Sequence, residues 1–88
     1  MIIYKRIPAN IGKEKEILKQ VEEAGKQKKE IILHTFTRRF IDRFSCVDTP
    51  EKPYIIKNFW IAGEIIYIKA GFNYKTISFD NIQQIEIN

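Results

Sequence analysis

The order of apolar and polar residues predicts a short strand followed by one helix. Residues Ile2–Ile7 are rich in β-branched side chains, and Pro8 ends the run because proline cannot donate to a strand ladder. Asn10 is a good helix N-cap, and Gly25 suits the position just beyond a helix end. Between them the apolar residues form one stripe with the ~3.6-residue period of a helix: Ile11, Ile17, Leu18, Val21 and Ala24.

The remainder of the chain predicts strands separated by turns. The polar segment 26–30 predicts a loop, and the turn-forming residues of Asp48–Pro53 predict another. The predicted strands are Ile31–Thr37, Tyr54–Ile61, Glu64–Ala70, Lys75–Phe79 and Ile82–Ile87. Turns at Ala62-Gly63 and Gly71–Tyr74 separate three of these strands.

The turns also predict a register for the last strands. Four pairs define it: Phe59 with Ile66, Ile55 with Ala70, Ile68 with Ile77, and Ile66 with Phe79. One face of the sheet then carries Ile55, Phe59, Ile61, Ile66, Ile68, Ile77 and Phe79. The other face carries the apolar residues Ile56, Trp60, Ile65 and Tyr67 beside the polar residues Asn58, Lys69, Thr76 and Ser78. Because both faces are partly apolar, the sheet is expected to be covered on both sides or strongly curled.

Residues 38–48 fit two periodicities. Phe36, Phe40 and Phe44 are four residues apart, so they share one face of a strand and equally one face of a helix. We prefer a strand that follows a tight or irregular turn before Arg38. The predicted fold is therefore α+β: one helix packed on a strongly curled, mainly antiparallel sheet, with the order strand, helix, strand and then a β-meander. A small closed barrel is the extreme form of that curl.

Length and cysteine content narrow the class of protein. The chain has 88 residues, which fits one domain spanning residues 1–88. Its single cysteine excludes an internal disulfide and a cysteine-based metal site, and it fits a reducing compartment. The sequence has no signal-peptide pattern and no apolar run of the ~20 residues that a membrane helix needs. We therefore expect a cytoplasmic protein that does not bind membranes.

Residue types that carry catalysis are few and scattered. His34, the only histidine, lies in a predicted strand and is expected to be structural. Cys46 is expected to be buried and inert, with a Cys46–His34 nucleophile and base as the alternative. The carboxylates form no obvious pair, and the glycines are isolated rather than gathered in a phosphate loop. We expect a protein that is not an enzyme and that holds no cofactor or metal.

Charge and aromatic content point toward nucleic acid or an acidic partner. The net charge is +4 at pH 7, and the basic excess lies in the first half of the chain. Candidate contacts with phosphates or an acidic partner are Arg38, Arg39, Arg43, Lys28 and Lys29. The candidate aromatic contact surface, on which unpaired bases can stack, is Trp60, Tyr67, Phe72 and Tyr74. The opposing interpretation places Phe36, Phe40 and Phe44 in the core and the arginines on a solvated face.

Protein binding is the function that we favour from the sequence. A two-sided apolar sheet in so short a chain leaves a patch that a homodimer can bury through Trp60, Tyr67 and Ile65. An exposed edge strand can also pair with a strand of another protein. The hypothesis is a small non-catalytic protein-binding module that acts as an adaptor, an inhibitor or a self-assembling piece. Its gene would be carried by a bacterium, a phage or a plasmid. The alternative is a basic module that binds nucleic acid.

The tail of the chain carries a resemblance to known families. Residues Lys75–Ile87 contain a strand, a Phe-Asp-x-Ile turn at Phe79–Ile82 and a closing strand. This segment resembles the end of Sm-like and SH3-like barrels and of the YolD-like proteins of Gram-positive bacteria and their phages. The resemblance covers 13 of the 88 residues and implies a curled sheet. The strand before the helix departs from the Sm-like order, and no functional residue is carried over.

Overall fold

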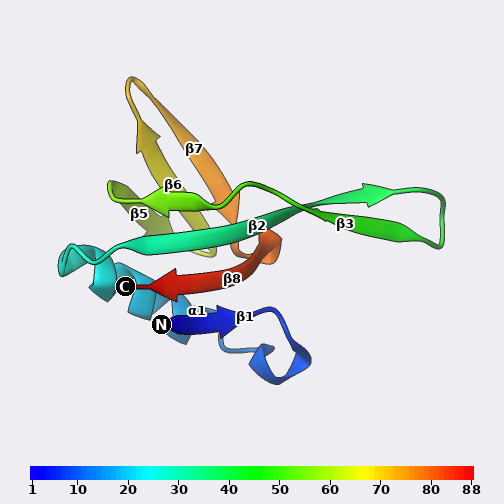
Figure 1. Ribbon diagram of the computed structural model, residues 1–88, viewed down its shortest axis with the longest axis horizontal. Helices are drawn as coiled ribbons and strands as arrows, with labels where there is room; N and C mark the ends of the chain where they lie inside the picture. Colours follow the sequence, from blue (N-terminus) through cyan, green and yellow to red (C-terminus); the bar gives the residue numbers. More distant parts are fainter.

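A computed structural model describes residues 1–88 and contains one α-helix and eight strands (Figure 1). The elements are β1 (Ile2–Lys5), η1 (Pro8–Asn10), α1 (Glu14–Lys26), β2 (Ile31–Phe40), β3 (Cys46–Pro50), β4 (Tyr54–Ile56), β5 (Phe59–Ala62), β6 (Ile65–Ala70), β7 (Asn73–Ser78), η2 (Phe79–Asn81) and β8 (Ile82–Ile87). All pairings between strands are antiparallel. The predicted α+β class, with one helix on a mainly antiparallel sheet, is confirmed.

The strands form two open sheets rather than a closed barrel. One sheet has the order β1-β8-β2-β3, with β4 also paired to β2, and the other has the order β5-β6-β7. The chain passes from the first sheet to the second after β4 and returns to it with β8, so the two termini lie side by side (Figure 1). The ammonium group of Met1 donates a hydrogen bond of 2.7 Å to the carbonyl oxygen of Ile87.

The core lies where the buried stripe of α1 meets one face of each sheet. Its 13 buried residues are Tyr4, Ile17, Leu18, Val21, Ala24, Ile31, Leu33, Ile56, Ile66, Ile77, Phe79, Ile82 and Ile85. The predicted helix stripe is therefore correct for every member except Ile11, which is exposed. No helix is long and apolar enough to cross a membrane.

The start of the helix differs from the prediction. Asn10 is not its N-cap, because Pro8–Asn10 form a short 3₁₀ turn in which the Asn10 side chain donates to the Lys5 carbonyl at 2.6 Å. Gly12 then adopts a φ of +87°, a left-handed conformation that a helix cannot continue through. The helix begins only at Glu14, with Lys13 as an N-cap that makes no side-chain hydrogen bond. Ile11 consequently lies outside the helix.

The end of the helix also differs, because Gly25 lies inside it. The left-handed residue beyond the helix end is Lys28, with a φ of +57°. Its N–H donates to the Gly25 carbonyl, and the Lys29 N–H donates to the Ala24 carbonyl, the paired bonds of a Schellman motif. Gly25 instead serves the packing of α1 on β5, since a Cβ atom there would lie 2.6 Å from the ring of Phe59.

The second sheet keeps the predicted faces but not the predicted register. Phe59 pairs with Ile68 and Ile66 pairs with Ile77, which is two residues away from the prediction in each hairpin. The turns are two-residue turns at 63–64 and 71–72, whose glycines have φ values of +61° and +63°. A shift of two residues leaves every side chain on the same face. The inward placement of Phe59, Ile61, Ile66, Ile68 and Ile77 is therefore confirmed.

The predicted strand Tyr54–Ile61 is two strands. It breaks at Lys57-Asn58, so β4 stays with the first sheet and β5 begins the second. Ile55 pairs with Ile32 of β2 rather than with Ala70. It is exposed, while its neighbour Ile56 faces the core. The predictions that placed Ile55 on the inner face and Ile56 on the outer face are both wrong, because pairing with β2 reverses which residues of this strand point inward.

Residues 38–48 form a hairpin, so the turn predicted before Arg38 is wrong. β2 continues unbroken to Phe40, and the chain turns within residues 41–45. The Asp42 carboxylate accepts hydrogen bonds from the backbone N–H groups of Phe44 and Ser45, which closes the turn without a glycine. The predicted loop that began at Asp48 starts later, because Asp48–Pro50 belong to β3.

The close approach of Gly25 and Phe59 predicts an unusual effect of a helix-favouring substitution. In an exposed helix, Gly→Ala stabilises by about 1 kcal/mol. Here the new Cβ displaces the Phe59 ring, so we expect Gly25→Ala to lower the free energy of unfolding by about 1 kcal/mol in a denaturant titration. In a Phe59→Leu background, which removes the ring, the same substitution should be neutral or stabilising. Stabilisation by Gly25→Ala alone would show that the ring does not pack against the helix.

Candidate binding surfaces

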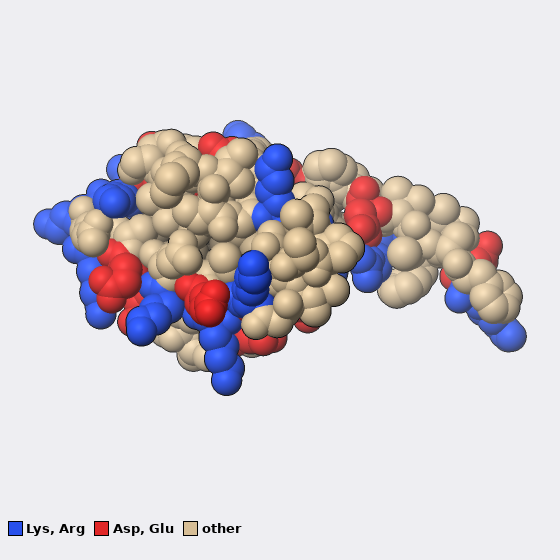
Figure 2. Space-filling view, turned by 90° about the horizontal axis from the view of Figure 1, so that it is seen from below, with Lys and Arg blue, Asp and Glu red and all other residues tan.

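The most prominent surface is the hairpin of residues 36–50, here called the arm. β8 pairs with β2 only as far as Thr35, and β4 pairs only with Ile31–Leu33. Beyond that point β2 has β3 as its sole partner, so the arm is a two-stranded ribbon with two free edges. Figure 1 shows the arm extending away from both sheets, and Figure 2 shows it as a narrow, mostly uncharged projection with basic and acidic groups at its tip.

A small cluster holds the base of the arm on the body. Phe36 is buried, and its ring lies 5.1 Å from the Arg6 guanidinium and 5.8 Å from the Arg38 guanidinium. Arg38 also donates to the Asp48 carboxylate across the ribbon at 2.9 Å. That hydrogen bond is the main reason that the pKa of Asp48 is lowered. Within this cluster, the Arg6–Phe36 contact joins the base of the arm to the body.

The outer part of the arm is apolar and exposed. Phe44 is 96% exposed and Phe40 is 74% exposed, and Ile41 and Val47 are exposed beside them. The interpretation that placed Phe36, Phe40 and Phe44 in the core is therefore correct only for Phe36. Cys46, which was expected to be buried, is exposed on β3. Both predictions fail because the apolar residues of this segment continue along the chain past Phe36, where the core ends.

The structure does not gather the predicted basic residues into one patch. Lys28 and Lys29 precede β2, whereas Arg38, Arg39 and Arg43 lie at or beyond its far end (Figure 1). A strand of ten residues separates the two groups by about 33 Å. Within the arm, Arg38 is paired with Asp48, and Arg39 points to the opposite face of the ribbon. Arg43 lies in the turn.

Three of the four predicted aromatic residues do come together. Trp60, Tyr67 and Tyr74 lie on the outer face of the β5-β6-β7 sheet, with ring centroids 5.1 to 5.8 Å apart. Trp60 and Tyr67 are stacked in parallel planes, and Trp60 is 47% exposed. Phe72 is fully exposed at the β6–β7 turn and makes no ring contact with the other three. We call Trp60, Tyr67 and Tyr74 the aromatic cluster.

A cleft lies on the free-edge side of β5, beside the aromatic cluster. Its volume is about 320 Å³, and it is lined by Glu22, Gly25, Lys26, Lys57, Phe59, Trp60 and Ile61. Lys26 and Glu22 form an exposed ion pair at 3.9 Å, and Lys57 has no ion-pair partner. Sequence reasoning missed this cleft, because only the break between β4 and β5 brings Lys57 next to the helix.

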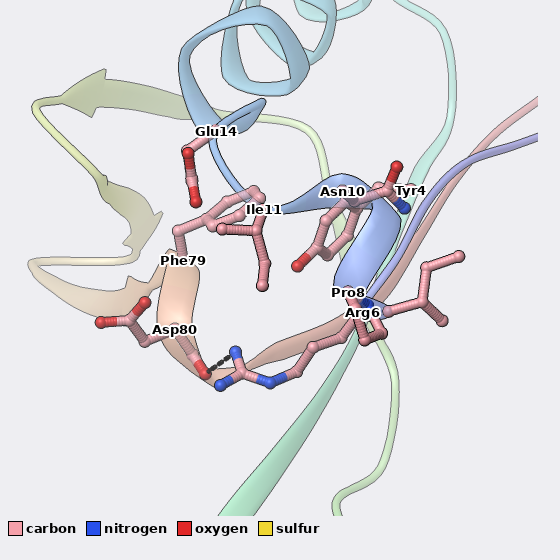
Figure 3. A pocket seen from close by; sticks show the side chains of 9 residues that line it. Tyr4, Arg6, Pro8, Asn10, Ile11, Glu14, Phe79 and Asp80 are labelled. Carbon is pink, nitrogen blue, oxygen red and sulfur yellow. Dashed lines mark hydrogen bonds between the residues drawn. The ribbon is translucent and has the colours of Figure 1, made fainter.

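A second hollow lies between η1 and η2, shown in Figure 3. Its volume is about 380 Å³, and the side chains of Tyr4 and Glu14 point into it. Arg6 closes one side by donating to the Asp80 carbonyl oxygen at 2.6 Å. Burial is the main cause of a raised pKa at Tyr4, the Arg6 charge opposes it, and the Glu14 and Asp80 charges add to it. These contacts tie β1 to the start of β8.

The catalytic alternative has no geometry to support it. His34 lies on β2 with its Nε2 atom 2.9 Å from the Glu86 carboxylate on β8, and Gln84 donates to the same carboxylate oxygen. Cys46 pairs with Phe40 in the arm, farther from the body than the Arg38–Asp48 pair. His34 lies in the part of β2 that pairs with β8. The structure therefore does not pair Cys46 with His34. No group of three or more histidine, cysteine or acidic side chains is arranged to hold a metal ion.

Comparisons with protein-family models, curated proteins and solved structures found no match for this chain.

The hydrogen bonds of the arm predict two carboxyl groups whose pKa values are lowered by different donors. The Phe44 N–H is the main cause of a lowered pKa at Asp42, and the Arg38 guanidinium is the main cause at Asp48. In a ¹³C NMR titration both side chains should titrate below the ordinary aspartate range. Arg38→Gln should raise the pKa of Asp48 and leave that of Asp42 unchanged.

The same shifts give the pH dependence of the arm. A carboxyl whose pKa is lowered on folding stabilises the folded form above its unfolded pKa, and this contribution disappears as the pH falls through the folded value. The arm should therefore loosen under acidic conditions before the body does. Ordinary pKa values at both residues would show that the turn and the Arg38–Asp48 pair are not formed in solution.

Proposed function

We propose that this protein is a non-catalytic protein-binding module and that the arm is its contact element. The observation that carries the proposal is the exposure of four bulky apolar side chains on an element that covers no core: Phe40, Ile41, Phe44 and Val47. Apolar surface of this kind is favourably removed from water by another apolar surface. A module with such an arm can act as an adaptor, as an inhibitor that inserts the arm, or as a self-assembling piece.

The charges of the arm favour a protein over nucleic acid as its partner. Arg38 and Asp48 neutralise each other, and Asp42 adds a negative charge next to Arg43 at the turn. Only Arg39 and Arg43 remain for phosphate contacts, whereas binding to DNA draws its affinity from several such contacts. An apolar groove bordered by one or two carboxylates matches both the apolar side chains and the remaining arginines.

Nucleic-acid binding remains the second candidate, on a different surface. The aromatic cluster favours it, because Lys69 lies on the same face of the sheet as Tyr67 and unpaired bases can stack on aromatic rings. The separation of Lys28 and Lys29 from the arginines of the arm weakens it, since the length of β2 lies between the two groups. The experiment on the arm is therefore designed to distinguish the two classes of partner.

Photocrosslinking at two matched hairpin tips tests the proposal. Phe44 at the tip of the arm and Phe72 at the β6–β7 turn are both nearly fully exposed phenylalanines. We replace each in turn with benzoylphenylalanine and irradiate cells of the source organism. The proposal predicts a discrete adduct at position 44 that protease removes and nuclease does not, and no such adduct at position 72. Sensitivity of the position-44 adduct to nuclease, or equal protein adducts at both positions, would contradict the proposal.

A variant of the arm supplies the control for folding. Phe40→Ser combined with Phe44→Ser removes exposed side chains only, so the free energy of unfolding should change by less than about 0.5 kcal/mol. Benzoylphenylalanine placed at Ile41 should give the same protein adduct in the wild-type background and lose it in this variant. Retention of the adduct would mean that the apolar side chains are not what the partner recognises.

A further inference from the structure

β5 presents unused backbone hydrogen-bonding groups along its outer edge. The Lys69 N–H donates to the Asn58 carbonyl at 3.0 Å, so Asn58 is a hydrogen-bonded position of the β5–β6 ladder. Because such positions alternate along an antiparallel strand, the next ones on β5 are Trp60 and Ala62. The N–H and C=O groups of Phe59 and Ile61 therefore point away from β6. Neither residue takes part in any backbone hydrogen bond outside the ladders. The edge thus offers two donors and two acceptors.

The cleft of about 320 Å³ lies along this same edge, between β5 and the C-terminal half of α1. Lys57 borders it from the β4–β5 break, and Lys26 borders it from the helix. Gly25 forms part of the wall between them, where a larger side chain would meet the Phe59 ring. An edge strand facing a helix across a cleft is an arrangement in which an extended peptide can add as one more strand.

We propose that an extended segment of a partner protein, carrying an acidic side chain, adds to the free edge of β5 in this cleft. The surface is separate from the arm, so the inference does not rest on the proposed role of the arm. It specifies the chemistry of a second contact: backbone hydrogen bonds supply the docking, and the two lysines select an acidic residue.

The charges along the cleft are the reason to expect an acidic side chain on the added segment. The Lys57 ammonium has no ion-pair partner, and Lys26 is held only by Glu22 across 3.9 Å, with both side chains more than half exposed. The cleft is therefore net positive, with two ammonium groups and one carboxylate. A carboxylate from the added strand meets both lysines without displacing a strong interaction.

The free backbone N–H and C=O groups of β5 are the reason to expect a peptide rather than a nucleic acid. The carbonyl oxygens of Phe59 and Ile61 need N–H donors at strand spacing, which a peptide backbone supplies and a phosphodiester backbone lacks. A strand added beside β5 also places a side chain next to Trp60, within the ~4.5–5.5 Å range of cross-strand neighbours. Trp60 is half exposed and backed by Tyr67, so it can pack against an apolar residue of that strand.

The test is a selection with a phage-displayed library of random linear peptides on the full chain. We expect the enriched sequences to contain an acidic residue within an alternating, β-prone segment. A synthetic peptide of the enriched sequence should shift the NMR amide signals of Phe59 and Ile61. Lys57→Glu should weaken its binding about tenfold. Lys13→Glu makes the same charge change outside the cleft and should leave binding unchanged.

Ile61→Pro tests the backbone contact directly. The Ile61 N–H points to the free edge, so proline there removes a docking donor while the ladder to β6 keeps its hydrogen bonds. Binding should be lost while the thermal transition stays cooperative, and the variant of the arm should bind the peptide normally. No enrichment over the Lys57→Glu variant, undiminished binding to Ile61→Pro, or displacement of the peptide by oligothymidylate would overturn the proposal.

Discussion

Strand β2 is shared by the core and the arm, and the hydrogen bonding along its two edges decides where one ends and the other begins. Over Ile31–Leu33 it pairs with β8 on one edge and β4 on the other. Ile31 and Leu33 have no exposed surface, and α1 packs against them. Past Thr35 the strand pairs only with β3, and from Thr37 onward its side chains are exposed. A strand that continues beyond its sheet exposes whatever side chains follow.

The rest of the structure is arranged around that shared strand. β8 joins β2 to β1. β4 leads the chain from the first sheet into the second, which meets the helix at β5. Only 15 of the 88 residues are buried, so the chain leaves several large apolar side chains on its surface. They fall mainly on the arm, on the second sheet around the aromatic cluster, and in the N-terminal segment of residues 1–11. Aromatic side chains are enriched at binding interfaces, and contiguous exposed apolar patches mark interaction sites.

Periodicity in the sequence predicted the faces of the elements but not their partners. The helix stripe and the inner face of the second sheet followed from spacing alone, and both are confirmed apart from Ile11 and Ile55. The register could not follow, because a shift of two residues keeps the same faces and only the turn glycines decide it. Phe40 and Phe44 continue the pattern of Phe36, and no local signal marks the point where β8 stops covering β2.

The candidate surfaces depended even more on tertiary structure. The aromatic cluster was predictable, since Trp60 and Tyr67 share the outer face of the hairpin in either register and Tyr74 follows on the next strand. The basic residues were close in sequence, but the length of β2 separates them. Arg6 and Lys57 gain their roles from contacts with Phe36 and with the cleft beside α1, which no spacing along the chain reveals. Gly25 looked like a helix end because its packing partner, Phe59, lies far along the sequence.

Amide hydrogen exchange followed by NMR tests the central claim that the arm stands apart from the cooperative core. The account predicts that the amides of Thr37, Arg39, Val47 and Thr49, which belong to the ladder of the arm, exchange through local opening. They should exchange much faster than those of Ile31–Leu33, which open only when the protein unfolds. Equal protection of the two groups would contradict the account, because the arm would then be packed into the body and its apolar side chains would not be free for a partner.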